Sequence, residues 1–424
     1  MKLLNRRETL ALSTAAVSGV FLAAPALAVG RAKVVIVGGG FGGASAARTL
    51  RQVDPDIDVT LITEAAKFTT CPFSNLVIAG ERPLETITFG YSALAAQGIE
   101  VIIGLASGIE PAARLVRMQD GSTVAYDRLV VSPGIDLKYN AVPGYSKDLE
   151  TLMPHAWKAG QQTVLLRDQL TAMPQGGTVL ISVPDNPYRC PPGPYERASL
   201  MAYYLSRNNP TAKIIIIDGK DTFSKQSLFT KAWDTLYPNM ISFVPFASNG
   251  GILNVDGAQM SIVTAFESFR GDVINFIPPQ KAPQFLLEAG LAGDAEWCGI
   301  DQATFESSFV PGVHVLGDAA IVGDMPKSGF SAAVQGAVCA HVLAALLRDQ
   351  SPNRGTLLNT CYSFVSPTYG ISIAGVYRVT EEGRLKSVEG AGGTSVIDAP
   401  PEVRAAEADH ARSWYDNLTT HLFG

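Results

Sequence analysis

Cysteine is the residue type in this chain with the widest chemical reach, because a thiolate can attack sulfur, bind a metal or bond to a cofactor. The closest pair, Cys339 and Cys361, lies 22 positions apart, so C-x-x-C zinc or thioredoxin spacing and C-x-x-C-H haem attachment are both impossible. We therefore expect no metal site, and haem chemistry has to come from another chain. The cysteines are Cys71, Cys190, Cys298, Cys339 and Cys361.

Three glycines near the start of the chain, Gly38, Gly40 and Gly43, have the G-x-G-x-x-G spacing of a dinucleotide-binding turn. A β-branched run precedes them, an alanine-rich stretch follows, and the next predicted strand, 58–63, delivers Glu64 at its carboxyl end. Such glycines let the backbone approach a pyrophosphate at a helix N-terminus, and the carboxylate accepts hydrogen bonds from ribose hydroxyls. The pattern predicts a nucleotide site rather than a plain tight turn.

A second motif, Gly317-Asp318, ends a short apolar strand and precedes a predicted helix. It resembles the second FAD signature of two-dinucleotide-domain flavoproteins of the glutathione-reductase type, in which the aspartate binds the ribityl chain. That resemblance implies FAD as the cofactor. A helix beginning near Ser328, with Lys327 beside it, would point its positive end at the pyrimidine edge of the flavin. An ordinary surface lysine is the equal alternative for Lys327.

The second βαβ unit departs from that superfamily's pattern. Its predicted strand, 177–183, leads into the loop 184–194, which contains five prolines and one glycine. Proline has no N–H to donate and its ring obstructs close approach, so this loop cannot cradle a pyrophosphate. We therefore expect no nicotinamide site; the loop instead delivers Cys190, and a helix is predicted to restart near Tyr195.

Four stretches of sequence together resemble the flavoprotein subunit of flavocytochrome c sulfide dehydrogenase. They are TCPFSN (70–75), CPPGPYERAS (190–199), MPKSGFSA (325–332) and NTCYSFV (359–365). The resemblance implies an FAD-dependent enzyme that oxidises hydrosulfide to sulfur or polysulfide, and the export signal described below predicts that it acts in the periplasm. It also implies a c-type cytochrome subunit as the partner that takes the electrons.

The same resemblance implies roles for individual residues. Cys71 corresponds to the residue that forms a thioether with the flavin, Cys190 and Cys361 to a redox disulfide over the flavin ring, and Glu196 to an acid or base beside it. A structural disulfide remains the alternative for the cysteine pair, and a first-turn acid at a helix N-terminus the alternative for Glu196. Cys298 is interpreted, with Cys339, as a buried structural thiol.

Three rival functions are left open. Sulfide:quinone reductase shares the flavin-disulfide chemistry but docks on a membrane, whereas 400–424 predicts a charged, mixed helix that suits packing on protein. A noncatalytic flavoprotein partner of a sulfur-oxidising complex and an NAD(P)H-dependent reductase are the others. The apolar positions of that helix are Ala405, Trp414, Leu418 and Leu422.

The first 28 residues are interpreted as an export signal. Arg6-Arg7 resembles a twin-arginine signal, with an ordinary secretory signal as the alternative, and APALA supplies a small-x-small cleavage pattern. Removing this segment lowers the formal charge from −6 to −8, which argues against nucleic acid as a partner. We expect no membrane span in the mature chain, because the apolar stretch 331–347 is shorter than the about 20 residues required.

The predicted fold class is α/β, with two Rossmann-like dinucleotide-binding domains of the glutathione-reductase type and a C-terminal domain. The 424 residues, 47% of them apolar, supply enough material for two or three packed cores. The FAD-binding domain is placed at 30–143 and 281–351, the second Rossmann-like domain at 144–280, and the C-terminal domain at 352–424.

Overall fold

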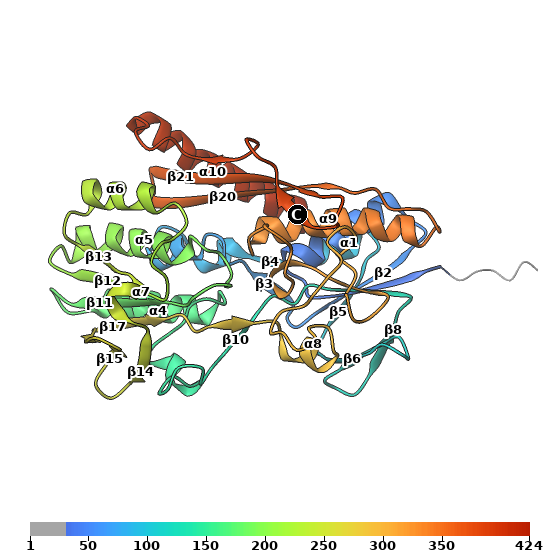
Figure 1. The fold of residues 1–424 in the computed structure, drawn as a ribbon, viewed down its shortest axis with the longest axis horizontal. Coiled ribbons are helices and arrows are strands. Elements are labelled where there is room, and N and C mark those ends of the chain that lie inside the picture. The colour runs from blue at the N-terminus through green and yellow to red at the C-terminus, as the bar shows by residue number, and fades with distance from the viewer. Residues whose placement is uncertain (1–30) are drawn as a thin grey trace, which may run out of the picture. The chain divides into compact units, whose positions relative to one another are not determined.

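The computed structural model describes residues 31–424, and Ala32–Gly424 form one compact unit (Figure 1). The predicted export signal lies outside the described residues. The architecture is α/β with two parallel sheets of the dinucleotide-binding type and a C-terminal antiparallel sheet, which confirms the predicted fold class. The domain boundaries proposed above remain predictions.

A five-stranded parallel sheet carries the first glycine motif. Its buried strands are rich in valine and isoleucine, as expected where helices cover both faces of a parallel sheet. A strand from late in the chain joins its edge, so the two halves of the predicted FAD-binding domain share one sheet. In spatial order the strands are β19 (Val313–Val315), β9 (Arg128–Val131), β1 (Lys33–Val37), β2 (Asp58–Thr63) and β5 (Glu100–Ile103).

Two helices cover one face of this sheet and contact each other closely. Helix α1 (Phe41–Val53) begins directly after the glycine turn, and α9 (Gly329–Leu346) follows the Gly317-Asp318 turn. A Cβ at Gly336 would lie 2.3 Å from the Gly42 carbonyl oxygen, so glycine is required where the two helices approach. The starts of both helices are thereby held side by side.

Helix α9 is the one helix of the described part long and apolar enough to cross a membrane. Half of its most apolar window is nevertheless buried against the rest of the protein, including α1 and the C-terminal strand β20. Buried core helices pass the same test of length and composition. Gln335, which the sequence places on this helix, is buried and accepts a hydrogen bond from the Gly317 backbone N–H at 2.8 Å.

A second parallel sheet carries the proline-rich loop. Strand β11 is followed by that loop and by helix α5 (Gly193–Asn208), which starts two residues before the predicted position at Tyr195. The sheet has the order β13 (Ile241–Val244), β12 (Lys213–Asp218), β11 (Thr178–Val183) and β17 (Val273–Phe276). The helices α4 (Gln161–Ala172) and α6 (Gln226–Leu236) complete this part of the fold.

The C-terminal segment lies across helices of both nucleotide-binding units. Its long hairpin, β20 (Thr356–Ser366) and β21 (Tyr369–Val379), contacts α5 and α9, and Figure 1 shows it with α10 above both units. Helix α10 (Pro401–Phe423) packs on this hairpin; of its four predicted apolar contacts, Leu422 is buried and the other three are half-buried. Tyr415 of α10 bonds to the Thr70 hydroxyl at 2.7 Å, which ties the helix to the Cys71 loop.

The remaining elements are short. Antiparallel ladders are formed by β3 (Lys67–Thr69) with β4 (Thr88–Gly90), β6 (Ala106–Glu110) with β7 (Leu115–Met118) and β8 (Thr123–Ala125), β10 (Asp136–Leu137) with β18 (Gln280–Lys281), and β14 (Ile252–Asp256) with β15 (Ser261–Thr264) and β16 (Ser268–Arg270); β22 (Leu385–Ser387) and β23 (Gly393–Thr394) extend the C-terminal hairpin. The short helices are α2 (Ser74–Ile78), α3 (Ser92–Ala96), α7 (Phe246–Asn249), α8 (Gln284–Glu288), η1 (Leu84–Ile87), η2 (Asp148–Thr151) and η3 (Gly317–Ala319).

Candidate functional site

One cavity of about 460 Å³ brings together most of the residues predicted from the sequence. It runs from the glycine turn past the Cys71 loop to the loop and strand that carry Cys190 and Cys361. Three predicted residues, Gly43, Gly317 and Lys327, do not line it. The predicted residues that do line it are Gly38, Gly40, Glu64, Cys71, Cys190, Glu196, Asp318 and Cys361.

The glycine turn forms a backbone surface at the N-terminus of α1. Gly38 has φ +106°, and a Cβ there would lie 2.4 Å from the Ser132 carbonyl oxygen. A Cβ at Gly43 would lie 1.8 Å from the Gly38 carbonyl oxygen, so Gly43 permits the turn to pack on the helix without itself reaching the cavity. Glu64 follows β2 and is exposed at the cavity, where its carboxylate can accept hydrogen bonds from ribose.

Asp318 has a buried oxygen atom available for a ligand. Its Oδ1 lies without a hydrogen-bond partner within the described structure, and Oδ2 lies 3.7 Å from Nη1 of Arg189. Buried polar atoms are almost always paired, so this atom points to a hydroxyl-bearing ligand in the cavity. The glycine turn, Glu64 and Asp318 therefore fit the pyrophosphate, the ribose and the ribityl chain of FAD.

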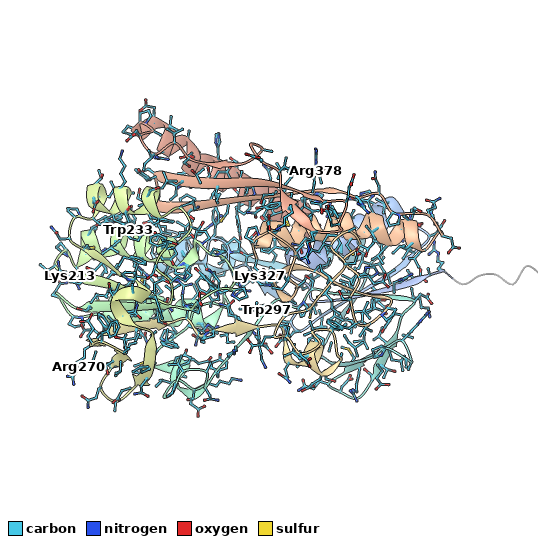
Figure 2. All side chains as sticks on the ribbon, viewed as in Figure 1. Lys213, Trp233, Arg270, Trp297, Lys327 and Arg378 are labelled. Atoms are coloured by element: carbon cyan, nitrogen blue, oxygen red, sulfur yellow. The ribbon has the colours of Figure 1, made fainter. Side chains whose placement is uncertain are left out.

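Lys327 is buried, so its interpretation as an ordinary surface lysine is wrong. Its ammonium donates to the carbonyl oxygens of Asp318 at 2.8 Å and Ala320 at 2.6 Å, and it lies 3.9 Å from the centre of the Trp297 ring (Figure 2). Its own carbonyl oxygen accepts from the Cys190 N–H at 2.8 Å. Lys327 thus joins the Asp318 turn to the Cys190 loop, and its expected contact with flavin remains a prediction.

Cys190 and Cys361 come from different units of the fold and meet at the cavity. Cys190 lies in the proline-rich loop with φ +58°, and Cys361 lies on β20. Both are free thiols in this structure, and both line the same cavity. Interaction with Cys361 and burial raise the pKa of Cys190, whereas interaction with Cys190 lowers the pKa of Cys361 to about 7. The two thiols thus lie near enough to influence each other's ionisation, as the proposed disulfide partners must.

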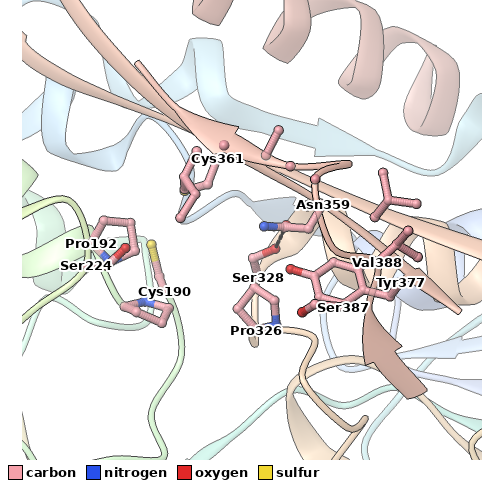
Figure 3. Close-up of a pocket in the computed structure, with 18 residues that line it drawn as sticks. Cys190, Pro192, Ser224, Pro326, Ser328, Asn359, Cys361, Tyr377, Ser387 and Val388 are labelled. Atoms are coloured by element: carbon pink, nitrogen blue, oxygen red, sulfur yellow. Dashed lines mark hydrogen bonds between the residues drawn. The ribbon is translucent and has the colours of Figure 1, made fainter. Parts of the chain in front are cut away.

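A second cavity, of about 370 Å³, is lined by the same cysteine pair (Figure 3). Cys190 and Cys361 lie toward one end of it and Tyr377 and Val388 toward the other. No charged residue lines it among the described residues, and the middle of β21 forms part of the wall. The cysteine pair therefore contributes both to the cleft of the glycine turn and to a small uncharged cavity.

Glu196, in the first turn of α5, faces the cleft. Its Oε1 accepts from the Phe364 backbone N–H at 2.9 Å and its Oε2 from Asn75 Nδ2 at 2.9 Å. Burial raises the pKa of this carboxyl group above its usual value, although both hydrogen bonds favour the charged form. The position suits an acid or base beside the thiols, and it also joins α2, α5 and β20.

Cys71 lies beside the Trp157 segment. Its Sγ donates to the Trp157 carbonyl oxygen at 3.5 Å, and the Arg189 guanidinium donates to the same oxygen. The thiol is half-buried and lines the cleft. Cys298 and Cys339, in contrast, are completely buried away from it, in agreement with their interpretation as core thiols.

The ribose position of the second βαβ unit is already occupied by protein. Asp218 ends β12, as an acidic residue does in a nicotinamide site. Its carboxylate accepts from the Tyr195 hydroxyl and from Lys220 Nζ at 2.6 Å, while the Tyr195 ring stacks on Phe223 with centroids 3.7 Å apart. These contacts support the expectation that this unit binds no nicotinamide.

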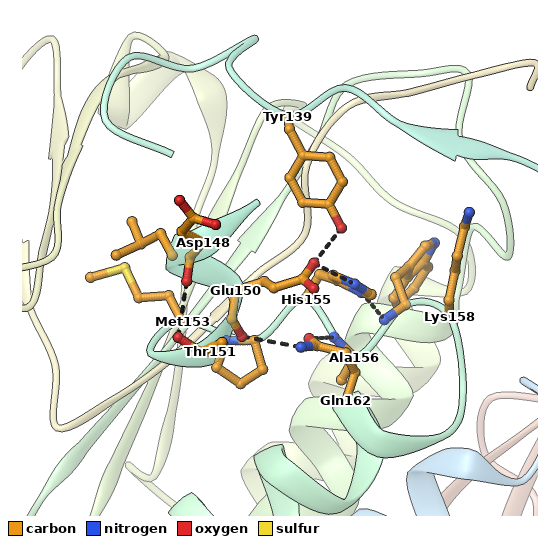
Figure 4. A network of polar contacts seen from close by, with 12 residues as sticks. Tyr139, Asp148, Glu150, Thr151, Met153, His155, Ala156, Lys158 and Gln162 are labelled. Atoms are coloured by element: carbon orange, nitrogen blue, oxygen red, sulfur yellow. Dashed lines mark hydrogen bonds and ion pairs between the residues drawn. The ribbon is translucent and has the colours of Figure 1, made fainter. Parts of the chain in front are cut away.

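A histidine network holds the segment that carries Trp157. His155 accepts from the Trp157 N–H through Nδ1 at 2.8 Å, and its Nε2 lies 3.5 Å from Oε2 of Glu150, which also accepts from the Tyr139 hydroxyl (Figure 4). Burial lowers the pKa of His155 from 6.5 to about 3. The histidine is therefore neutral in the folded protein at every pH near neutrality.

This neutral histidine predicts a loss of stability at acid pH. Below pH 6.5 the unfolded chain takes up a proton on His155 and the folded chain does not, so stability is full above that pH and falls as the pH drops toward 3. Between pH 7 and pH 5 the expected loss in unfolding free energy is about 2 kcal/mol. Urea titrations at both pH values should show it, His155→Asn should flatten the slope, and the exposed His410→Gln should leave it unchanged. An unchanged slope in His155→Asn would contradict this assignment.

Three cations of the site were missed from the sequence: Arg197 and Lys225 are buried, and Arg189 is half-buried. Arg189 and Arg197 line the cleft, and Lys225 approaches the cysteine strand from the start of α6. Arginine and lysine are usually exposed, so residue type alone gave no sign of their burial. The one available signal was position, because Arg189 adjoins Cys190 and Arg197 adjoins Glu196.

Comparisons with known proteins agree with this geometry. Residues 163–278 match the family model of the central region of the sulfide dehydrogenase (flavocytochrome c) flavoprotein chain, and residues 353–423 match that of the flavocytochrome c sulphide dehydrogenase flavin-binding region. Residues 32–167 match the pyridine nucleotide-disulphide oxidoreductase model.

Individual relatives cover different shares of the chain. A sulfide dehydrogenase (flavocytochrome c) flavoprotein chain from Chlorobaculum thiosulfatiphilum is 60% identical over 48 residues, which are 100% of that sequence and 11% of this chain. Mitochondrial sulfide:quinone oxidoreductase from Mus musculus is 21% identical over 76% of this chain and 72% of its own. The solved sulfide:quinone oxidoreductase of Aquifex aeolicus has a TM-score of 0.70 at 17% identity, covering 92% of both chains, and shows the shared fold.

Proposed function

The chain belongs to the family of flavocytochrome c sulfide dehydrogenase flavoprotein chains, and from this premise we propose that it oxidises hydrosulfide through a Cys190–Cys361 disulfide. The family makes it an FAD-binding oxidoreductase that acts on sulfide. One observation carries the finer proposal: the two thiols, Glu196, Cys71 and the glycine turn all line one cavity.

The chemistry assigned to the protein is thiol–disulfide exchange. Hydrosulfide attacks one sulfur of the oxidised pair, a new S–S bond forms between substrate and that cysteine, and the other cysteine leaves as a thiolate. When bound, FAD supplies a two-electron acceptor that can release electrons singly. Glu196 accepts or returns the proton at the reacting sulfurs, because burial raises its pKa toward the working range. The uncharged second cavity suits a lengthening chain of neutral sulfur.

The residues that would hold FAD act by position. The Gly38 turn and the N-terminus of α1 would bind the pyrophosphate, Glu64 the ribose, and Asp318 the ribityl chain. The start of α9 lies beside the Asp318 turn, where its positive end would favour negative charge on a bound flavin. Arg189 orders the Cys71 side of the cleft through the Trp157 carbonyl oxygen.

We further propose that a c-type cytochrome subunit takes the electrons and that the protein acts in the periplasm. The matching family and the Chlorobaculum relative are flavoprotein chains of a flavocytochrome c, which supports the cytochrome, and the spacing of the cysteines leaves this chain without a haem attachment motif. The export proposal depends on residues 1–28 alone.

Sulfide:quinone reductase is the second candidate, because similarity to that enzyme extends over most of the chain. Anaerobic addition of sulfide to the purified holoprotein is expected to bleach the flavin, and oxidised cytochrome c is expected to restore its colour. Restoration by decyl-ubiquinone and not by cytochrome would favour the quinone enzyme. If sulfide does not bleach the flavin, the protein is instead a noncatalytic flavoprotein partner. If NADH bleaches it, the protein is an NAD(P)H-dependent reductase.

The proposed covalent bond between Cys71 and flavin can be tested separately from the disulfide chemistry. Mass spectrometry of the denatured mature protein is expected to find the flavin mass on the peptide that contains Cys71, because the thiol lines the cleft beside Trp157. In Cys71→Ser the flavin should separate from the chain on denaturation, while Cys339→Ala should retain it. A wild-type Cys71 peptide without the flavin mass would refute the bond and leave the disulfide chemistry intact.

A further inference from the structure

Lys225 is a buried cation beside the cysteine strand. It precedes α6, has a left-handed backbone with φ +62°, and has a side chain only 7% exposed. Its Nζ donates to the Cys361 carbonyl oxygen at 3.2 Å and to the Ser363 hydroxyl at 2.8 Å, both on β20. The ammonium group is therefore anchored to the strand on which the reactive thiol lies.

No carboxylate forms an ion pair with Lys225 within the described part of the chain, which is costly for a buried ammonium group. The anionic groups whose charges act on it are Cys361, Glu196, Cys190 and Glu407. Both oxygens of Glu196 are occupied by Asn75 and Phe364. Glu407 binds Arg404 at 2.8 Å. Cys361, whose own carbonyl oxygen Lys225 binds, is thus the titratable residue left to balance this charge as a thiolate.

We propose that Lys225 is a positioning residue that stabilises the Cys361 thiolate, so that hydrosulfide attacks Cys190 and Cys361 is the sulfur that leaves. This inference rests on the proposed function and adds the order in which the two cysteines act. Hydrosulfide donates an electron pair to Cys190 Sγ, the Cys190–Cys361 bond breaks, and its electron pair remains on Cys361. The product is a Cys190 persulfide, whose proton can pass to the carboxylate of Glu196.

The direction follows from general thiol chemistry. In thiol–disulfide exchange the thiol of lower pKa is the better leaving group. Interaction with Cys190 and the charge of Lys225 lower the pKa of Cys361 to about 7, while burial and Glu196 act against this. The charged or titratable groups that act on Cys361 are Cys190, Lys225 and Glu196. A substitution of Lys225 should therefore change the pH at which the Cys361 thiol ionises.

Alkylation of the reduced holoprotein tests the electrostatic role without sulfide. Iodoacetamide modification of each cysteine is followed from pH 5 to 10 by peptide mass spectrometry. We expect Cys361 to react with a midpoint near pH 7 in the wild type, and about tenfold more slowly at pH 7 in Lys225→Met, whose thiol is less ionised. Lys225→Arg should restore the profile, and Lys231→Met, a change at an exposed position of α6, should not alter it. An unmoved Cys361 profile in Lys225→Met would overturn the proposal.

A second measurement on the wild type identifies the attacked sulfur, and it decides the order even if Lys225→Met does not fold. The oxidised protein is mixed anaerobically with sulfide, quenched with iodoacetamide and digested. We expect the additional sulfur atom on the Cys190 peptide; finding it on the Cys361 peptide would overturn the order. Absence of both a persulfide and flavin bleaching would count against the proposed function, whereas the alkylation profile would still decide the role of Lys225.

Discussion

Replacing Cys190 or Cys361 by serine is expected to abolish reduction of the bound flavin by sulfide. The rate of anaerobic bleaching should fall at least about 10³-fold in each single variant, because one remaining thiol cannot form the disulfide that accepts the substrate sulfur. The double variant should be no slower than either single variant, since the two sulfurs act as one unit. Stopped-flow absorbance of the flavin measures all three.

A matched control separates this chemistry from a loss of structure. Cys339 is fully buried in α9 and lies outside both cavities, so Cys339→Ala should retain sulfide-dependent bleaching. All variants should bind flavin, because Cys190 and Cys361 belong to the loop and strand above the cleft rather than to the glycine turn. Rapid bleaching in a protein without Cys190 or without Cys361 would remove the disulfide from the mechanism.

Replacing Arg197 by methionine is expected to cause the largest loss of stability. This guanidinium is 2% exposed and donates to Asn75, Asn275 and the carbonyl oxygens of His155 and Ala156 at 2.6 to 3.1 Å. Burial lowers its pKa to about 10, so it stays charged at neutral pH. Methionine fills the volume but removes all four donated bonds, and of the acceptors the His155 carbonyl oxygen keeps the Asn275 amide at 2.8 Å as a donor. The expected net cost is about 3 kcal/mol.

Urea unfolding of the holoprotein at pH 7, followed by circular dichroism, measures this effect. Arg207→Met on the same helix is the matched control, because that side chain is half-exposed and its bond to Glu81 should contribute less than about 1 kcal/mol. Arg197→Lys should fall between the two, since one ammonium group keeps the charge but cannot reach all four acceptors. Equal unfolding midpoints for Arg197→Met and Arg207→Met would show that the buried network contributes little.

The sequence motif around Lys327 did not predict which groups its side chain binds. Its place before a helix at the Gly317-Asp318 motif predicted either a flavin contact or an exposed side chain. The side chain is buried, its ammonium group binds the turn at Asp318 and Ala320, and its carbonyl oxygen accepts from the Cys190 loop, while the flavin contact stays a prediction. Whether a lysine turns inward depends on the acceptors that tertiary packing collects around it, and those acceptors come from separate segments.

The amino-acid sequence by itself determined the features that depend on local stereochemistry. The glycines at 38, 40 and 43 specify a tight turn before a helix, and five prolines exclude a phosphate cradle from the second unit. The Gly317-Asp318 signature predicted FAD, and the resemblance of four short stretches to a known family predicted the roles of the cysteines. Each of these conclusions needs only neighbouring residues, since a missing Cβ or a missing N–H acts within its own loop.

Only the tertiary structure decided which groups face each other and which charges are buried. Cys190 and Cys361 are 171 positions apart in sequence, and they meet because β20 crosses α5 and α9. The same crossing brings Phe364 to Glu196 and Cys361 to Lys225. Desolvation and the distance between charges set the reactivity of a thiol, and both quantities arise from packing between remote segments, which local sequence does not encode.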